Sequence, residues 1–236
     1  MLFICLLFVS YSQNIITYAD LSINNYSSFG TCNVSGTIII QKSIKEYEFF
    51  NCKKLESIVF SNDSSVINIG NSAFSFCSNL ESIIIPKSIK SIGHYAFHGC
   101  EKLKSVIFSD DSSIRKIGNN AFSFCSNLES IIIPCLVKLI ENYSFYNCEK
   151  LKSVIFSDEY LLTNIGDNAF SFCKNLESIT IPQSIISIED HAFHKCEKLK
   201  SIIFLNESSV MNIGNNAFSF CINLESIIIP CLVISI

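Results

Sequence analysis

One short phrase recurs along most of the chain, and this repetition constrains the fold more than any other feature. Cysteines mark the phrase at spacings that alternate between 25 and 23 residues, and they are Cys52, Cys77, Cys100, Cys125, Cys148, Cys173, Cys196 and Cys221. A period in the twenties is typical of solenoids, whose small units bury their apolar faces only against neighbouring copies. The sequence therefore predicts stacked coils, and we interpret them as one domain because no linker interrupts the repeat.

The phrase contains a strand signal with a defined inside and outside. Segment 80–85 has the spacing Leu-x-x-Ile-x-Ile, which is typical of the strand in a leucine-rich repeat. Side chains alternate across a strand, so Ile83 and Ile85 are expected to face the interior. Ser82 and Ile84 are then expected to face outward.

The return segment of each coil carries the remaining recurrent residues. Its apolar pattern is too irregular for a long helix and too sparse for a second strand, so a loop or short helical turn is expected. A recurrent glycine, represented by Gly70, is expected to adopt a positive φ in a tight turn. Phenylalanines recur at two positions of the repeat, before the cysteine in some coils and at the end of the strand in the others. Their rings, represented by Phe76 and Phe108, are expected to fill one core at staggered positions.

The full consensus resembles a known family. It reads Cys-x-x-Leu-x-x-Ile-x-Ile-Pro-x-x-Ile-x-x-Ile-Gly-x-x-Ala-Phe over 49–236 and resembles the BspA-like, Treponema pallidum-type leucine-rich repeats. The resemblance implies a mainly β, right-handed repeat solenoid, with a parallel sheet on the concave side and loops or short helices on the convex side. It also implies a secreted or cell-surface protein that adheres to host proteins or other cells, without enzymatic activity or a cofactor.

The ends of the chain depart from the repeat. Residues 1–12 combine an apolar run with small residues, as in a secretory signal peptide, although a buried first strand is the alternative. Residues 13–46 hold a degenerate coil that is expected to cap the solenoid. The repeats occupy 47–236 and stop early in a new coil, so a truncated family member with a weak C-terminal end is expected.

Composition excludes several classes of protein. The chain is 49% hydrophobic, but the repeat spreads these residues, and no apolar run of membrane-spanning length occurs. A net charge of −4, without a Lys/Arg cluster, argues against a nucleic-acid partner. No catalytic motif is present, so an enzyme is not expected.

Four histidines form two matching pairs, His94 with His98 and His191 with His194. Such spacing could seat a metal ion on a helical turn. No third ligand recurs at a fixed phase, so solvated loops are favoured and no metal site is predicted.

The cysteine column is expected to hold reduced, buried thiols that pack as small hydrophobes. Neighbouring thiols in parallel, in-register coils rarely reach the dihedral angle that a disulfide needs. Cys135 and Cys231 lie at a different phase and are expected to be the accessible thiols, and Cys5 would leave with the signal segment.

Three outward columns follow from the strand alternation. One is a serine column, and a second alternates in charge from Glu81 to Glu225, which favours cross-strand ion pairs that fix the register. The third is a candidate binding stripe that consists of Val59, Ile84, Ile107, Ile132, Ile155, Thr180, Ile203 and Ile228. Contiguous apolar patches of this extent often mark interfaces, although β-branched residues also simply suit stacked strands.

The sequence thus favours a secreted or surface-displayed recognition module that binds a protein or glycan on another cell through the concave sheet. The alternative is a structural spacer or self-associating solenoid without an external ligand. Export would also permit glycosylation at five sequons, which are Asn25, Asn33, Asn62, Asn142 and Asn206.

Overall fold

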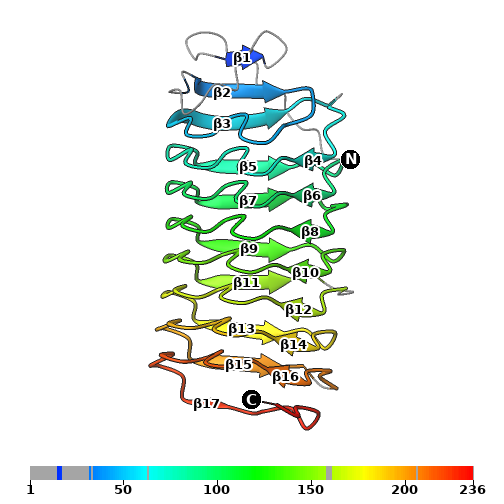
Figure 1. The fold of residues 1–236 in the computed structure, drawn as a ribbon, viewed down its shortest axis with the longest axis vertical. Helices are drawn as coiled ribbons and strands as arrows, with labels where there is room; N and C mark the ends of the chain where they lie inside the picture. The colour runs from blue at the N-terminus through cyan, green and yellow to red at the C-terminus, as the bar shows by residue number, and fades with distance from the viewer. Residues whose placement is uncertain are drawn as a thin grey trace, which may run out of the picture.

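The chain winds into a column of stacked coils (Figure 1). The structure is a computed structural model that describes residues 15–17, 32, 34–62, 64–157, 161–205 and 207–235. The expected signal segment 1–12 lies outside these residues. So do three of the five sequons, Asn25, Asn33 and Asn206.

A long sheet of ten parallel strands runs along one side of the column. Its strands, in spatial order, are β1 (Ile15–Thr17), β2 (Ser35–Ile40), β3 (Lys54–Phe60), β5 (Ser82–Ile85), β7 (Ser105–Phe108), β9 (Ser130–Ile133), β11 (Ser153–Phe156), β13 (Ser178–Ile181), β15 (Ser201–Phe204) and β17 (Ser226–Ile227). Each strand follows its neighbour after one coil, which makes the pairing parallel.

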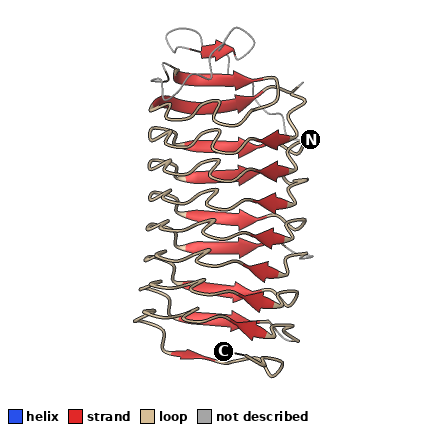
Figure 2. Ribbon diagram, viewed as in Figure 1, coloured by secondary structure: helices blue, strands red, loops and turns tan. Residues whose placement is uncertain are grey.

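A second sheet of seven strands occupies the return side, where a loop or short helical turn was expected. It contains β4 (Asn68–Ile69), β6 (Ser91–Ile92), β8 (Lys116–Ile117), β10 (Leu139–Ile140), β12 (Asn164–Ile165), β14 (Ser187–Ile188) and β16 (Asn212–Ile213). The turns that follow its strands, such as residues 93–104, fit the expected loop, but the expectation that the return segment holds no second strand was wrong. Stacking supplies each two-residue segment with partners on both sides. Ile117, for example, pairs with Ile92 and with Ile140. Across the described ranges Figure 2 shows strands and loops and no helix.

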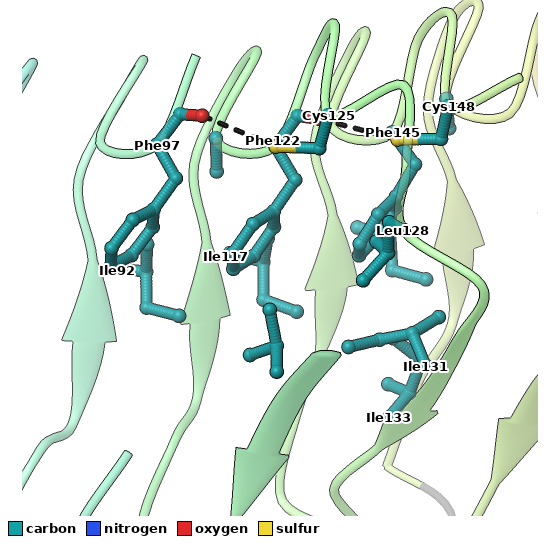
Figure 3. Close-up of a cluster of buried hydrophobic side chains, with 14 of the residues drawn as sticks. Ile92, Phe97, Ile117, Phe122, Cys125, Leu128, Ile131, Ile133, Phe145 and Cys148 are labelled. Carbon is teal, nitrogen blue, oxygen red and sulfur yellow. Dashed lines mark hydrogen bonds between the residues drawn. The ribbon is translucent and has the colours of Figure 1, made fainter. Parts of the chain in front are cut away.

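The strand alternation predicted from the sequence is confirmed. Ile83 and Ile85 are buried, whereas Ile84 between them is 60% exposed. Inward side chains of both sheets meet in one continuous core, seen around Ile117, Leu128 and Ile131 in Figure 3.

A stack of phenylalanine rings runs through this core. Adjacent ring centroids lie 5.2–5.6 Å apart with nearly parallel planes, and the stack contains Phe49, Phe74, Phe97, Phe122, Phe145, Phe170, Phe193 and Phe218. The stacking follows from the repeat, because each coil places the same ring at the same height above its neighbour. Large rings therefore fill the core at one phase along the column.

The cysteine column lies beside these rings. Each thiol from Cys77 to Cys221 donates a hydrogen bond to a phenylalanine carbonyl oxygen one coil earlier, at 3.2–3.3 Å. Figure 3 shows two of these bonds, from Cys125 to Phe97 and from Cys148 to Phe122. These seven cysteines are free and buried, as predicted.

Cys52 was predicted to be a free member of the column, and this was wrong, because it forms a disulfide with Cys32. The in-register argument fails there because the first coil breaks the repeat. Cys32 and Cys52 are only 20 residues apart, and the register between β2 and β3 shifts at Gly36.

The recurrent glycine also differs from expectation. Gly70 is not among the residues with positive φ. A Cβ atom at Gly70 would lie 2.5 Å from the carbonyl carbon of Lys45 in the preceding coil, so close approach of two backbones explains this glycine.

Candidate binding face

The outward side of the long sheet presents the predicted apolar stripe. Ile107, Ile132 and Ile155 at its centre are 52%, 54% and 51% exposed. The register places stripe residues side by side, as in the pairs Ile84 with Ile107 and Ile132 with Ile155. All eight predicted stripe residues are exposed, including Thr180, whose hydroxyl interrupts an otherwise apolar row.

Serines flank the stripe on the same strands. They are half-buried or exposed, and they are Ser57, Ser82, Ser105, Ser130, Ser153, Ser178, Ser201 and Ser226. The face therefore offers an apolar row beside a row of hydroxyl groups, which both donate and accept hydrogen bonds.

The charged column forms ion pairs, as predicted, within pairs of coils. Lys104 Nζ lies 3.2 Å from Glu81 Oε2, and Lys152 Nζ lies 3.3 Å from Glu129 Oε2. All four side chains are more than half exposed, so each pair contributes little free energy, about 0.2–1 kcal/mol. The pairs line one edge of the serine row.

The strands of the long sheet associate in doublets, which the sequence reasoning missed. β5 pairs with β7 at four positions, but β7 pairs with β9 only at Ser105 and Ser130. The cause is loop length: the connection 109–115 after β7 is longer than the connection 86–90 after β5. The alternation of 25- and 23-residue spacings was the sequence signal for this arrangement.

A cavity of about 380 Å³ opens where β7 and β9 separate, and we call it the β7–β9 notch. It is lined by Ser105, Val106, Ile107, Phe108, Ser109, Asp110, Ser112, Ser130, Ile132, Pro134, Cys135 and Ser157. Two stripe residues and two members of the serine row therefore belong to the notch. Stripe, serine row and notch form one continuous face.

A second row of rings lies outside the core on the return side. Neighbouring centroids are 4.9–5.6 Å apart along an aromatic ladder that contains Phe50, Phe76, His98, Phe124, Tyr146, Phe172, His194 and Phe220. Phe76 and Phe124 were predicted to fill the core, which was wrong: they are 41% and 42% exposed. Their backbones have φ of 61° and 59°, which turns these side chains away from the interior.

The histidine pairs are partly built into this ladder, so the expectation of solvated loops was wrong for His98 and His194. His98 packs edge-to-face against Phe76 at 4.9 Å, and its Nδ1 lies 2.6 Å from Ser123 Oγ. Burial lowers the pKa of His98 below its ordinary value. Nowhere in the described ranges do three or more His, Cys, Asp or Glu side chains gather as metal ligands would.

The stacked parallel strands and the strand spacing define a leucine-rich-repeat solenoid. Residues 21–152 and 115–236 match the family described as BspA type Leucine rich repeat region, with six copies. The chain belongs to this family, whose members are non-enzymatic repeat scaffolds.

The chain is similar to several solved structures, and the first two of those described next share its fold. The T. pallidum leucine rich repeat protein TpLRR is 23% identical with a TM-score of 0.56, and the match covers 80% of this chain and 78% of that one. The pneumococcal vaccine antigen PcpA is 23% identical with a TM-score of 0.57, over 82% of this chain and 62% of PcpA. A leucine-rich repeat protein from Bacteroides ovatus is 26% identical with a TM-score of 0.44, over 81% and 63% of the two chains. The chain thus spans under two thirds of the length of two of these relatives.

No curated protein matches the chain. Within the described part of the chain, no helix has the length and apolar character needed to cross a membrane.

Proposed function

We propose that this protein is a secreted or surface-displayed recognition module that binds a protein on another cell, or its glycan, through the outward face of the long sheet. The exposed stripe carries the proposal. Water is in contact with about half of each central isoleucine, although the same coils bury their other isoleucines completely. A row of exposed β-branched residues on a rigid sheet favours binding to a complementary surface.

Two observations support an oxidising, extracytoplasmic location. The disulfide between Cys32 and Cys52 belongs to a class of bond that persists in secreted proteins and is rare in the cytosol. Asn62, the first residue of a sequon, is exposed in a turn beyond β3. Peptide mapping of secreted protein under non-reducing conditions tests the first point, because free Cys32 and Cys52 would remove this support.

The stripe could also pack against a second copy of the chain, as in the self-associating alternative. Solution mass distinguishes the two functions. A monomer across a wide concentration range supports recognition of an external partner, and a concentration-dependent oligomer supports the spacer.

The direct test replaces three stripe residues together, Ile107→Ser, Ile132→Ser and Ile155→Ser. We expect the variant to fold with a melting temperature close to that of the native chain, because the three side chains lie outside the core. It should lose binding to host-cell surface extracts that retain the native chain. Equal binding by the variant would contradict the proposal.

A matched control replaces Ile131, which neighbours the stripe residue Ile132 but is 1% exposed. Ile131→Ser buries an unpartnered hydroxyl and leaves a cavity, so it should destabilise the fold by about 2–5 kcal/mol. Stability measurements on both variants separate loss of a surface from loss of the fold.

A further inference from the structure

The β7–β9 notch differs chemically from the stripe that crosses it. Its walls are apolar where residues such as Ile107, Ile132 and Pro134 contribute, and serine hydroxyl groups and the Cys135 thiol also line it. One charged side chain lines it, the carboxylate of Asp110. Asp110 is exposed and forms no ion pair with any residue that the structure describes.

A ligand that satisfies both parts of this cavity needs an apolar stem and a cationic end. Basic side chains have this form: their methylene groups pack along apolar surface while the charged end remains at the rim. The cationic end would meet Asp110 and the serine hydroxyls, which accept its hydrogen bonds. A cavity of about 380 Å³ falls at the lower end of the range for pockets that hold small ligands.

We propose that the β7–β9 notch binds a lysine or arginine side chain of a protein partner. This inference rests on the proposed function, because the notch interrupts the same face, and it specifies the partner as a protein with a basic residue beside an apolar strip. The notch supplies a charge-selective contact, and the stripe supplies apolar area.

The repeat itself provides natural variants of the notch. Counterparts of Asp110 at intervals of 48 residues are Asn62, Asp158 and Asn206, so the carboxylate is present in only two of the four copies. Cys135 in the notch has its counterpart in Cys231, which follows a connection that carries Asn206. Cys135 thus shares the notch with a carboxylate, whereas the sequence has asparagine at the corresponding position before Cys231.

These two thiols allow a test that needs no known partner. Native protein is equilibrated with cystamine, whose mixed disulfide leaves a cationic aminoethyl group on the cysteine, or with bis(2-hydroxyethyl) disulfide, which leaves a neutral group of similar size. Mass spectrometry of digested protein gives the occupancy of Cys135 and of Cys231. We expect Cys135 to favour the cationic group roughly two- to fivefold at low salt, the effect of one exposed ion pair. Cys231 should show a much smaller preference.

Variants assign the effect to one carboxylate. Asp110→Asn should abolish the preference at Cys135, whereas Asp111→Asn should preserve it, because Asp111 is exposed but does not line the notch. Molar salt should weaken the preference by screening. Equal occupancy by both reagents at Cys135, or a preference that survives Asp110→Asn, would overturn the proposal.

The outcomes for the notch and for the proposed function remain separable. The thiol test uses the chain alone and does not depend on capture of a partner. If the triple stripe variant loses partner binding while Asp110→Asn retains it, the recognition function stands and the notch proposal fails. If the charge preference is present but stripe substitution leaves binding unchanged, the proposed face is wrong although the notch is cation-selective.

Discussion

The Sγ atom of Cys125 lies 3.2 Å from the carbonyl oxygen of Phe97 one coil earlier, so the thiol contributes a hydrogen bond between stacked coils. Burial also raises the pKa of the column thiols from Cys77 to Cys196, to about 12 at Cys77 and well above the ordinary value at Cys125. The pKa of Cys221 at the end of the column is instead lowered, chiefly by its hydrogen bond with Cys196. Because the thiolate is the reactive form, the thiols with a raised pKa should be chemically inert in the native state. We predict that iodoacetamide at pH 8 modifies Cys135 and Cys231 and spares the column from Cys77 to Cys196.

Unfolding in guanidinium chloride provides the control for this prediction, because all free thiols should then react. A disulfide between column neighbours, such as Cys77 with Cys100, in native oxidised protein would contradict the prediction. Rapid native alkylation of Cys125 would contradict it as well.

Two phenylalanines in one turn should differ sharply in their contribution to stability. Phe122 is fully buried in the inner stack, whereas Phe124 is 42% exposed on the aromatic ladder. We predict that Phe122→Ala lowers the free energy of unfolding by about 3–5 kcal/mol. Phe124→Ala should lower it by about 1 kcal/mol or less, as for other partly exposed sites.

Phe124→Gly tests the backbone part of this account. Its φ of 59° is a conformation that glycine adopts without steric cost, so the glycine variant should be more stable than the alanine variant by about 1 kcal/mol. Chemical denaturation of the three variants supplies the comparison. Equal losses from Phe122→Ala and Phe124→Ala would show that the outer ladder is as important to the fold as the core.

The repeat explains why much of the fold could be predicted. The alternation that buries Ile83 and exposes Ile84 depends only on strand geometry. The same alternation recurs in each copy of the phrase. The expectation for Phe76 failed because hydrophobicity does not reveal a positive φ, which decides whether a ring after a tight turn enters the core. The short strands of the second sheet were not predicted for a related reason. A two-residue strand is defined by its hydrogen-bonded partners, which lie one coil away in the sequence.

The disulfide and the notch depend on departures from the repeat. The bond of Cys32 occurs where the first coil is shorter than the others, a place where an argument from equivalent positions no longer applies. The notch follows from unequal connections after alternate strands, and the position of Asp110 beside it depends on how connection 109–115 folds. Sequence spacing indicates such a difference but does not give its shape.

Two sequons in the described residues should differ in occupancy. Asn62 is exposed in a turn and can accept a glycan. The Asn142 amide instead donates from Nδ2 to Asp167 Oδ2 at 3.1 Å, and its Oδ1 accepts from the backbone N–H of Asp167. The hydroxyl of Ser144 in the same sequon is buried and donates to the Gly118 carbonyl oxygen.

We therefore predict that protein from a eukaryotic secretory host carries glycan at Asn62 and little at Asn142, because a sugar on Nδ2 would crowd the Asp167 carboxylate of the next coil, which lies 3.1 Å from that nitrogen. Site-resolved mass spectrometry with and without glycosidase measures both occupancies. Asn62→Gln should eliminate most of the glycan-dependent mass at this pair of sites. High occupancy at Asn142 in folded, secreted protein would contradict the prediction.

His98 should make stability depend on pH. Its pKa is lowered by burial, so the unfolded chain binds its proton more readily than the folded chain. The contribution of His98 to the free energy of unfolding is fully present above the ordinary histidine pKa of about 6.5. It is lost as the pH falls through the lower pKa of His98 in the folded state. The side chains that contact the ring, Phe76, Tyr95, Ser123 and Phe124, carry no charge in this range.

The repeat again supplies a suitable replacement, because Tyr146 occupies the position of His98 in a later copy and packs between Phe124 and Phe172. We predict that His98→Tyr preserves the ladder and reduces the fall in melting temperature between pH 7.5 and 5.5. His194, whose pKa is also lowered chiefly by burial, should account for part of the remaining slope. Melting curves of His98→Tyr and of the His98→Tyr, His194→Tyr double variant across this range provide the measurement. An unchanged slope in the double variant would show that other groups control the acid sensitivity of the fold.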